Sequence, residues 1–236
     1  METARLGYQL VRSILDPHQV AEWRKRADSL RGQTAGIRRV FERIPETLLL
    51  AHSGPVMEAI EAFLGAQARP VRSILFDKSS EANWAVPWHQ DLTIAVRQRL
   101  PLDGFGPWSL KDGQLHVQPP QEILQQMAAI RLHLDDCGVT NGALRVVPGS
   151  HRLGRIPQSE IEHHVRSLGI VESPARAGDA RIMSPLVLHA SSKAVEPSRR
   201  RVLHIEYCAV QVQLPGGLEW AEGDAAPTGT SQSRAW

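Results

Sequence analysis

The sequence predicts a mainly β protein with flanking helices on its N-terminal side. From residue 68 onward, short extended runs are separated by Gly, Pro, Asn and Asp. This spacing is typical of a β-sandwich or barrel and unlike that of alternating βαβ units. Before residue 68, apolar residues recur at helical spacing in two segments. At 236 residues the chain is long enough to bury one core, so we expect a single domain over residues 1–236.

The first helix is expected to begin at Asp16-Pro17, because aspartate is a good N-cap and proline suits the first helical turn. Gly32 can end this helix, since glycine accepts the left-handed conformation of a helix terminus. The helical spacing is carried by Val20, Trp23, Ala27 and Leu30.

A second helix runs from about Pro55 to Leu64, with Gly65 as its terminator. Residues 36–41, between the two helices, are predicted to form a short strand. The N-terminal helices therefore occupy about residues 16–66, and we expect the β core to span about residues 68–212.

The core contains six extended runs, each bounded by turn-forming residues: Val71–Phe76, Ala129–Leu134, Ala143–Val147, Ala180–Met183, Leu186–His189 and Val202–Val212. Asn141-Gly142 is a strong tight-turn signal, so the segments 130–137 and 143–147 are predicted to pair as a hairpin. Residues 158–168 fit a short surface helix. Asp103–Gln118 shows no clear period and is expected to be a long loop, a candidate lid. The tail, 215–236, is expected to be mobile or loosely docked.

The charge pattern and the cysteine content limit the function classes. The net charge is +2, and basic residues are spread along the chain apart from Arg199-Arg200-Arg201, so no nucleic-acid partner is expected. No segment has the length and apolar character of a membrane span, and the N-terminus lacks a signal-peptide core. Cys137 and Cys208 lie in apolar runs and are expected to be buried free thiols. We expect a cytoplasmic protein that acts on a small soluble molecule; the oligomeric state cannot be read.

The tripeptide His89-Gln90-Asp91 is the first candidate functional motif. A histidine and a carboxylate two residues apart on an extended strand point to the same face. His189, at the end of another apolar strand, is the third candidate ligand. Two histidines and one carboxylate form the facial triad that holds Fe(II) and leaves open coordination positions. The hypothesis is therefore an oxygenase.

Arg200, eleven residues after His189, complements this triad. A dicarboxylate co-substrate that chelates iron at one end needs a cation for its other carboxylate. The planar guanidinium of arginine provides two parallel charge-assisted hydrogen bonds to a carboxylate and stays protonated. Strand alternation leaves Arg201 open as an alternative, because it shares a face with Leu203 and Ile205, whereas the spacing from His189 favours Arg200.

Several segments together resemble the phytanoyl-CoA dioxygenase family of Fe(II)- and 2-oxoglutarate-dependent oxygenases. The resemblance covers roughly residues 36–210. The matching pieces are Trp-His-Gln-Asp at 88–91, Leu-Asp-Asp at 134–136, Asn-Gly-Ala-Leu-Arg-Val-Val-Pro-Gly-Ser-His at 141–151, Gly178-Asp179 leading to His189-Ala-Ser, and Arg-Arg-Val-Leu-His-Ile-Glu-Tyr at 200–207.

The resemblance implies a double-stranded β-helix (jelly-roll, cupin-like) core with His89, Asp91 and His189 as iron ligands. It implies that Arg200 binds the distal carboxylate of 2-oxoglutarate, with Ser191 beside it. Trp108 stands where the family often has a tryptophan that contacts the co-substrate.

The activity implied is that of an iron-dependent oxidoreductase. 2-Oxoglutarate and dioxygen are consumed, succinate and carbon dioxide are released, and a C–H bond of a small molecule is oxidised. A stimulating effect of ascorbate is left open. A related halogenating group replaces the carboxylate ligand by a small residue, so Asp91 favours hydroxylation over chlorination, with desaturation or cyclisation as further outcomes. Two alternatives remain: a cupin-like metal-dependent hydrolase or isomerase, which leaves Arg200 and Ser191 without a role, and a non-enzymatic jelly-roll binding protein.

Other polar residues have mainly structural interpretations. Lys78 and Arg38 are expected to be solvated surface charges, with contact to substrate or co-substrate as the alternative. His133 could line the substrate pocket or be a hydrogen-bonded core residue, and His116 could contact substrate from the candidate lid. Asp135-Asp136 are expected to cap the turn before Asn141. Specificity is expected to reside in residues 92–118, the strand face at 131–135 and the tail.

Overall fold

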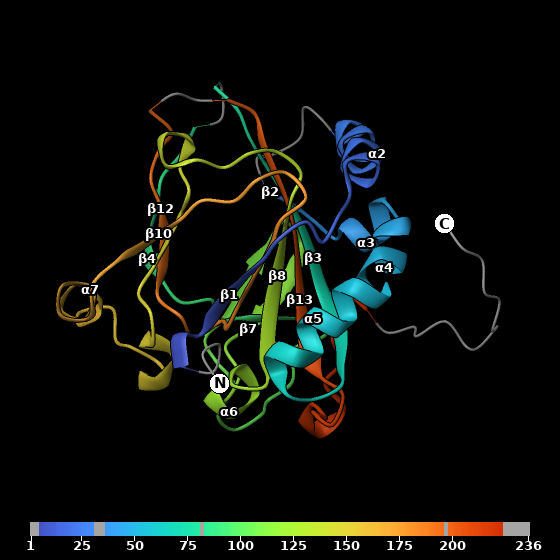
Figure 1. Ribbon diagram of the computed structural model, residues 1–236. Helices are drawn as coiled ribbons and strands as arrows, with labels where there is room; N and C mark the ends of the chain where they lie inside the picture. Colours follow the sequence, from blue (N-terminus) through green and yellow to red (C-terminus); the bar gives the residue numbers. More distant parts are fainter. Residues whose placement is uncertain (1–4, 31–35, 81–82, 196–197, 224–236) are drawn as a thin grey trace.

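Two antiparallel β-sheets face each other and form the framework of the computed structural model, which describes residues 5–30, 36–80, 83–195 and 198–223 (Figure 1). A group of helices covers the outer face of the larger sheet. The predicted mainly β fold with flanking helices is thereby confirmed, and the sheet pair is a double-stranded β-helix.

The larger sheet has the strand order β1-β11-β8-β13-β3-β2. Its strands are β1 (Tyr8–Val11), β11 (Ala180–Met183), β8 (Met127–His133), β13 (Arg200–Ala209), β3 (Ala68–Lys78) and β2 (Gly36–Arg38). The smaller sheet has the order β10-β9-β12-β4, with β10 (Val171–Ser173), β9 (Leu144–Val146), β12 (His189–Ser191) and β4 (Val86–His89). A third sheet has the order β5-β7-β6, with β5 (Ile94–Val96), β7 (Gln114–Val117) and β6 (Trp108–Lys111).

The α-helices are α2 (Pro17–Asp28), α3 (Val40–Arg43), α4 (Glu46–Ala51), α5 (Gly54–Leu64), α6 (Gln121–Leu124) and α7 (Ile161–Leu168). Short 3₁₀ turns lie at Val139–Asn141, Ser150–Leu153 and Pro215–Gly217. Within the described part of the chain, no helix is long and apolar enough to cross a membrane.

The surface helix expected at 158–168 is present as α7, and local signals define the two N-terminal helices that were predicted. Asp16 caps α2 through its side chain, which accepts a hydrogen bond from the Gln19 backbone amide, and the Gln19 side chain accepts one from Asp16. This reciprocal pair satisfies two of the amide groups that a helix start leaves free. α5 ends at Gly65, which has a left-handed φ of 68°. Both helices are thus confirmed; Gly32 lies outside the described residues.

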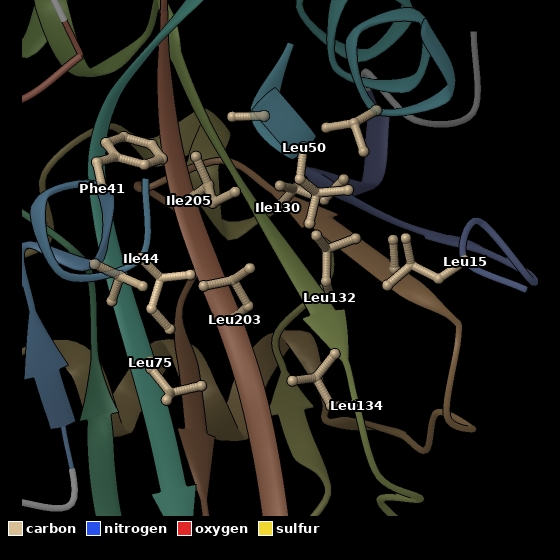
Figure 2. Packing of buried hydrophobic residues seen from close by; sticks show 14 of the residues in the cluster. Leu15, Phe41, Ile44, Leu50, Leu75, Ile130, Leu132, Leu134, Leu203 and Ile205 are labelled. Atoms are coloured by element: carbon tan, nitrogen blue, oxygen red, sulfur yellow. The ribbon is translucent and has the colours of Figure 1, made fainter. Parts of the chain in front are cut away.

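The main core lies between the larger sheet and helices α2 to α5. Figure 2 shows Leu75, Leu203, Ile205, Ile130 and Leu132 of the central strands pointing toward one another and toward residues of the helical layer. These strand residues occupy alternate positions, so they share one face of the sheet. The other face of the same strands is turned toward the smaller sheet, and it carries the polar side chains of the candidate site.

The predicted hairpin around Asn141-Gly142 is wrong. β8 pairs with β11 and β13 in the larger sheet, whereas β9 pairs with β10 and β12 in the smaller one. Gly142 has a φ of 68°, and a Cβ at this position would lie 2.7 Å from the Ser192 carbonyl oxygen. The Asn-Gly pair therefore allows a tight corner where the chain passes between sheets, which needs positive φ as much as a hairpin does.

The segment 103–118 is not a structureless loop. β6 and β7 form a hairpin whose turn is Asp112-Gly113, and β5 completes a small sheet. Of the tail predicted at 215–236, residues 215–223 are docked, and residues 224–236 lie outside the described part of the chain. Trp220 is 3% exposed, and the Glu222 carboxylate accepts a 2.5 Å hydrogen bond from the Ser73 hydroxyl. The predicted strand at 36–41 ends at Arg38 and is followed by α3 and α4, which were not predicted.

Candidate active site

His89, Asp91 and His189 come together at the edge where β4 and β12 pair. His89 and His189 are register partners across these strands, and their ring centroids are 4.2 Å apart. The Asp91 carboxylate lies 3.7 Å from Nε2 of His89 and 3.5 Å from Nε2 of His189. All three potential ligand atoms lie within 4.8 Å of one another, which is close enough for a single metal ion.

The backbone orients both imidazoles toward this point. Nδ1 of His89 is 2.8 Å from the Pro87 carbonyl oxygen, and Nδ1 of His189 is 3.0 Å from that of Val187. Each Nδ1 therefore carries the proton, which leaves Nε2 as the metal-binding atom. Two neutral imidazoles and one carboxylate are the donor set that suits a divalent transition metal such as Fe(II).

Gln90, between the two ligands of the tripeptide, anchors the turn. It is 7% exposed. Its side-chain amide donates to the carbonyl oxygens of Gly154 and Leu186, and its oxygen accepts from the Ile156 amide. Because all three bonds go to backbone groups of neighbouring segments, Gln90 holds His89 and Asp91 in place. The sequence reading gave Gln90 no role.

The three groups also influence one another electrostatically. Burial opposes ionisation of Asp91, but the charges of His189 and His89 lower the pKa of its carboxyl well below the usual range. Burial lowers the pKa of His189 to about 4, against the opposing effect of Asp91. At neutral pH the site therefore contains one carboxylate and a neutral His189, the protonation states that metal binding requires.

A cavity of about 150 Å³ opens beside the triad, between the two facing sheets. Among the described residues that line it, Lys78, Arg131 and Arg200 are cationic, and Asp91 is the only carboxylate. This excess of positive charge suits an anionic ligand with at least two negative charges.

Arg200 and Arg201 are separated by the pleat of β13. Arg200 lines the cavity and donates from Nη1 to the Gly142 carbonyl oxygen, with Cys137 Sγ 3.1 Å away. Arg201 points to the opposite face, where its guanidinium makes two 2.8 Å bonds to the Asp135 carboxylate. The geometry thus favours Arg200 over Arg201 as the partner of a ligand in the cavity.

Lys78 is not the solvated surface charge that was expected. It is 8% exposed, and its ammonium donates to the Trp84 carbonyl oxygen (2.8 Å) and to Ser191 Oγ (3.3 Å). Burial lowers the pKa of Lys78 to about 8, and the charges of Arg200 and Arg131 act in the same direction. Lys78, Ser191 and Arg200 therefore form one polar wall of the cavity.

Trp108 does not line this cavity. Its ring lies on β6, 5.6 Å from the guanidinium of Arg99, and packs in a separate apolar cluster. The tryptophan that does line the cavity is Trp84, which lies 4.3 Å from the Lys78 ammonium. Trp84, and not Trp108 as expected, is therefore the tryptophan placed to contact a ligand in this cavity.

Sequence reasoning missed Phe76, Val202 and His204 as cavity residues, whereas Arg131 belongs to the strand face at 131–135 that was expected to contribute to specificity. All belong to β3, β8 and β13 and share the strand face opposite the apolar core. Alternation with Leu75, Leu132, Leu203 and Ile205 was the available signal, since residues next to core positions on a strand face the other side of the sheet.

The other polar residues that the sequence singled out do not line the cavity. Asp135 is not a turn cap but the ion-pair partner of Arg201 and Arg24, whereas Asp136 accepts the Ala177 amide. His133 is buried, and neither ring nitrogen has a hydrogen-bond partner among the described residues. His116 is fully buried on β7. Both cysteines are buried and free, as predicted.

Comparison with known proteins identifies a matching family and a sequence relative. Residues 4–202 match the family described as Phytanoyl-CoA dioxygenase (PhyH). L-proline trans-4-hydroxylase from Streptomyces griseoviridis is 28% identical over 156 residues, which is 55% of this chain and 50% of the hydroxylase. The match thus spans half the length of that relative.

Several solved structures share the fold. EctD from S. alaskensis in its apoform has a TM-score of 0.71 and 20% identity over 90% of this chain and 76% of its own. AviO1 from Streptomyces viridochromogenes Tue57 has a TM-score of 0.67 and 21% identity over 90% of this chain and 94% of its own. The epimerase SnoN from nogalamycin biosynthesis has a TM-score of 0.68 and 19% identity, covering 97% and 93% of the two chains. EctD has been crystallised with bound Fe and with 2-oxoglutarate and 5-hydroxyectoine.

Proposed function

The chain belongs to the phytanoyl-CoA dioxygenase family of Fe(II)- and 2-oxoglutarate-dependent oxygenases, and on that premise we propose that it hydroxylates a C–H bond of a small molecule. One observation carries the proposal: His89, Asp91 and His189 meet at the edge of a cavity whose other wall is cationic. An iron site and an anion site are thus adjacent. We propose further that residues 1–236 act as one catalytic domain.

His89 Nε2, His189 Nε2 and the Asp91 carboxylate would hold the iron. The hydrogen bonds from the imidazoles of His89 and His189 to the carbonyl oxygens of Pro87 and Val187 set the tautomer of each ring. Gln90 fixes the turn between His89 and Asp91. When bound, iron together with 2-oxoglutarate and dioxygen supplies oxidative decarboxylation to succinate and carbon dioxide, coupled to oxidation of the substrate.

Arg200, Lys78 and Ser191 would bind the carboxylate of 2-oxoglutarate that lies away from the metal. The guanidinium and ammonium groups provide charge, and the Ser191 hydroxyl provides a further hydrogen bond. All three are less than a tenth exposed, so these interactions form in a water-poor cavity where each is stronger than at the surface. Phe76 and Val202 supply apolar walls.

Asp91 favours hydroxylation over halogenation, because its carboxylate occupies the ligand position that a halide would need. Relatives with this fold include an epimerase and a carbocyclase, so the fate of the oxidised carbon is a separate question. L-proline, the substrate of the hydroxylase relative, provides a first candidate for the size of the substrate.

The proposal is tested by succinate release from purified protein with Fe(II), 2-oxoglutarate and ¹⁸O₂. We expect succinate that carries one ¹⁸O atom, because one oxygen atom of dioxygen enters the new carboxylate. A hydrolase or isomerase with the same metal ligands would release no succinate, and a binding protein would bind 2-oxoglutarate without consuming it. Iron-loaded protein that produces no labelled succinate would refute the proposal; His189→Ala serves as the inactive control.

A further inference from the structure

A second group of charged side chains lies on the inner face of the larger sheet, away from Arg200. Arg72 shares its strand face with Lys78 and lies six residues before it on β3, which corresponds to about 20 Å along the strand. Its guanidinium donates a 2.7 Å hydrogen bond to Glu206 Oε1, and both residues are 7% exposed. The proposed 2-oxoglutarate site is thus at one end of this face, and an Arg-Glu pair is at the other.

Lys111, on the β6–β7 hairpin, adds an unpaired cation to this end. Its ammonium lies 3.2 Å from Thr93 Oγ1, and it has no carboxylate at ion-pair distance within the described residues. Burial lowers its pKa, and the charges of Arg72 and Arg38 act in the same direction, whereas Asp91 and Glu206 act in the opposite one. The Lys111 ammonium is therefore within electrostatic reach of the proposed iron ligand.

Thr93 connects this cation to the metal site. Together with Asp91 and Glu206 it lines a narrow cavity of about 10 Å³, whose other walls are mainly apolar. This space has room for little more than one water molecule. Because Lys111 donates a hydrogen bond to the Thr93 hydroxyl, a ligand group that reaches Thr93 also lies beside the Lys111 ammonium.

Two arginines beside Lys111 have unused donors. The Nε atoms of Arg72 and Arg38 are buried and have no hydrogen-bond partner in the part of the chain that the structure describes. Arg38 also forms an ion pair with Asp112 in the hairpin turn, so the hairpin is held over this end of the sheet. Buried donors without partners are costly, and a bound anion would satisfy them.

Glu206 limits the kind of anion. Burial opposes its ionisation, but Arg72 and His204 lower its pKa, so it is a carboxylate at neutral pH. Both neighbours contact Oε1. A dianion such as a phosphate monoester would be repelled by this charge, whereas a zwitterion has one group for each sign: a carboxylate for Lys111 and an ammonium for Glu206.

We propose that Lys111, with Arg38 and Arg72, binds the carboxylate of the primary substrate, and that this substrate is a small amino acid or a similar zwitterion whose ammonium faces Glu206. The inference rests on the proposed function, because it places the substrate on the opposite side of the triad from 2-oxoglutarate. The Arg200 side of the metal centre would then bind 2-oxoglutarate, and the Lys111 side would bind the carboxylate of the primary substrate.

The test uses the iron-loaded protein with saturating 2-oxoglutarate under argon, titrated calorimetrically with the twenty free L-amino acids and their carboxamides. We expect at least one amino acid to bind, and its carboxamide to bind at least about tenfold more weakly, since the amide lacks the charge. Lys111→Met is expected to weaken binding of the amino acid by about ten- to hundredfold and to leave binding of the carboxamide unchanged. Lys111→Arg should retain most of the affinity.

Lys25→Met is the matched control, because Lys25 lies on the exposed surface of α2, where it pairs with Glu22. Thermal unfolding checks that each variant is folded. The inference is wrong if Lys111→Met binds the amino acid as tightly as the wild type, if acid and carboxamide bind equally, or if no amino acid binds to protein that binds 2-oxoglutarate. Failure to bind 2-oxoglutarate would instead refute the proposed function. The metal-free protein, titrated with the same panel, would then test the Lys111 site alone.

Discussion

Arg200 and Arg201 are consecutive residues of β13 whose guanidinium groups lie on opposite faces of the larger sheet. Arg200 lines the cavity beside the triad, whereas Arg201 forms a bidentate pair with Asp135 under helix α2. One residue is thus available to a ligand and the other is committed to the fold. This division leads to two separable predictions.

Arg200→Gln is expected to raise the KM for 2-oxoglutarate by about ten- to hundredfold, because the variant loses a charge-assisted bond to the distal carboxylate. The measurement is succinate formation at increasing 2-oxoglutarate concentration. Arg97→Gln is a suitable control, since Arg97 pairs with Glu219 on the exposed surface. An unchanged KM in the Arg200 variant would show that the co-substrate binds elsewhere.

Asp135→Asn is expected to destabilise the fold by about 2–4 kcal/mol, because the largely buried Arg201 guanidinium loses its bidentate partner and keeps only Asp28. Urea unfolding measures the difference. The KM for 2-oxoglutarate should stay within twofold of the wild type, in contrast to the Arg200 variant. A stable Asp135 variant would mean that Asp28 alone can neutralise Arg201.

The same ion pair predicts the direction of acid sensitivity. Burial alone would raise the pKa of Asp135, but hydrogen bonds from the Arg201 side chain and backbone lower it below the ordinary value. A group with a lowered folded-state pKa stabilises the protein above its unfolded-state pKa of about 3.9. This stabilisation is lost as the pH falls through the folded-state value. Wild type and Asp135→Asn should therefore differ in unfolding free energy at neutral pH and converge in acid.

Metal binding is expected to depend on all three members of the triad. His189→Ala removes one of three protein ligands and leaves the Asp91 carboxylate with less compensation, so iron content after reconstitution should fall by at least about tenfold. Elemental analysis of the desalted protein measures this directly. His163→Ala is the control because His163 lies on the exposed side of α7. Full iron loading of the His189 variant would exclude this residue as a ligand.

Lys78 predicts a pH dependence of co-substrate binding. Its pKa is lowered to about 8 by burial and by the charges of Arg200 and Arg131, with Cys137 acting in the opposite direction. Below this pH the ammonium is protonated and attracts 2-oxoglutarate, and above it the charge is lost. We expect kcat/KM for 2-oxoglutarate to decline above pH about 8, since this ratio reports groups of the free enzyme.

Lys78→Arg separates this effect from other titrations, because arginine stays charged throughout the accessible range. The decline near pH 8 should then disappear, even if the overall rate is lower. A decline that persists in the arginine variant would assign the titration to another group.

Local sequence predicted those parts of the fold that depend on neighbouring residues. The start of α2 follows from Asp16, Pro17 and Gln19, and the end of α5 follows from Gly65, because capping involves groups within one turn. β11 was predicted with its observed bounds. The Asn-Gly signal led to the wrong prediction that segments 130–137 and 143–147 pair. A turn that permits positive φ can join two strands of one sheet, but it can also mark the passage from one sheet to another.

By itself, the sequence identified the ligand types and their spacing: a histidine and a carboxylate two residues apart, a distant histidine, and an arginine eleven residues later. Only the tertiary structure decided that His89 and His189 are register partners, that Lys78 is buried beside Ser191, and that Arg200 faces the cavity while Arg201 does not. It also separated Trp108 from the cavity and placed Lys111 against Thr93, which lines a second small cavity together with Asp91. The physical reason is that strand alternation gives two faces to every strand, but only long-range pairing determines which face becomes the interior.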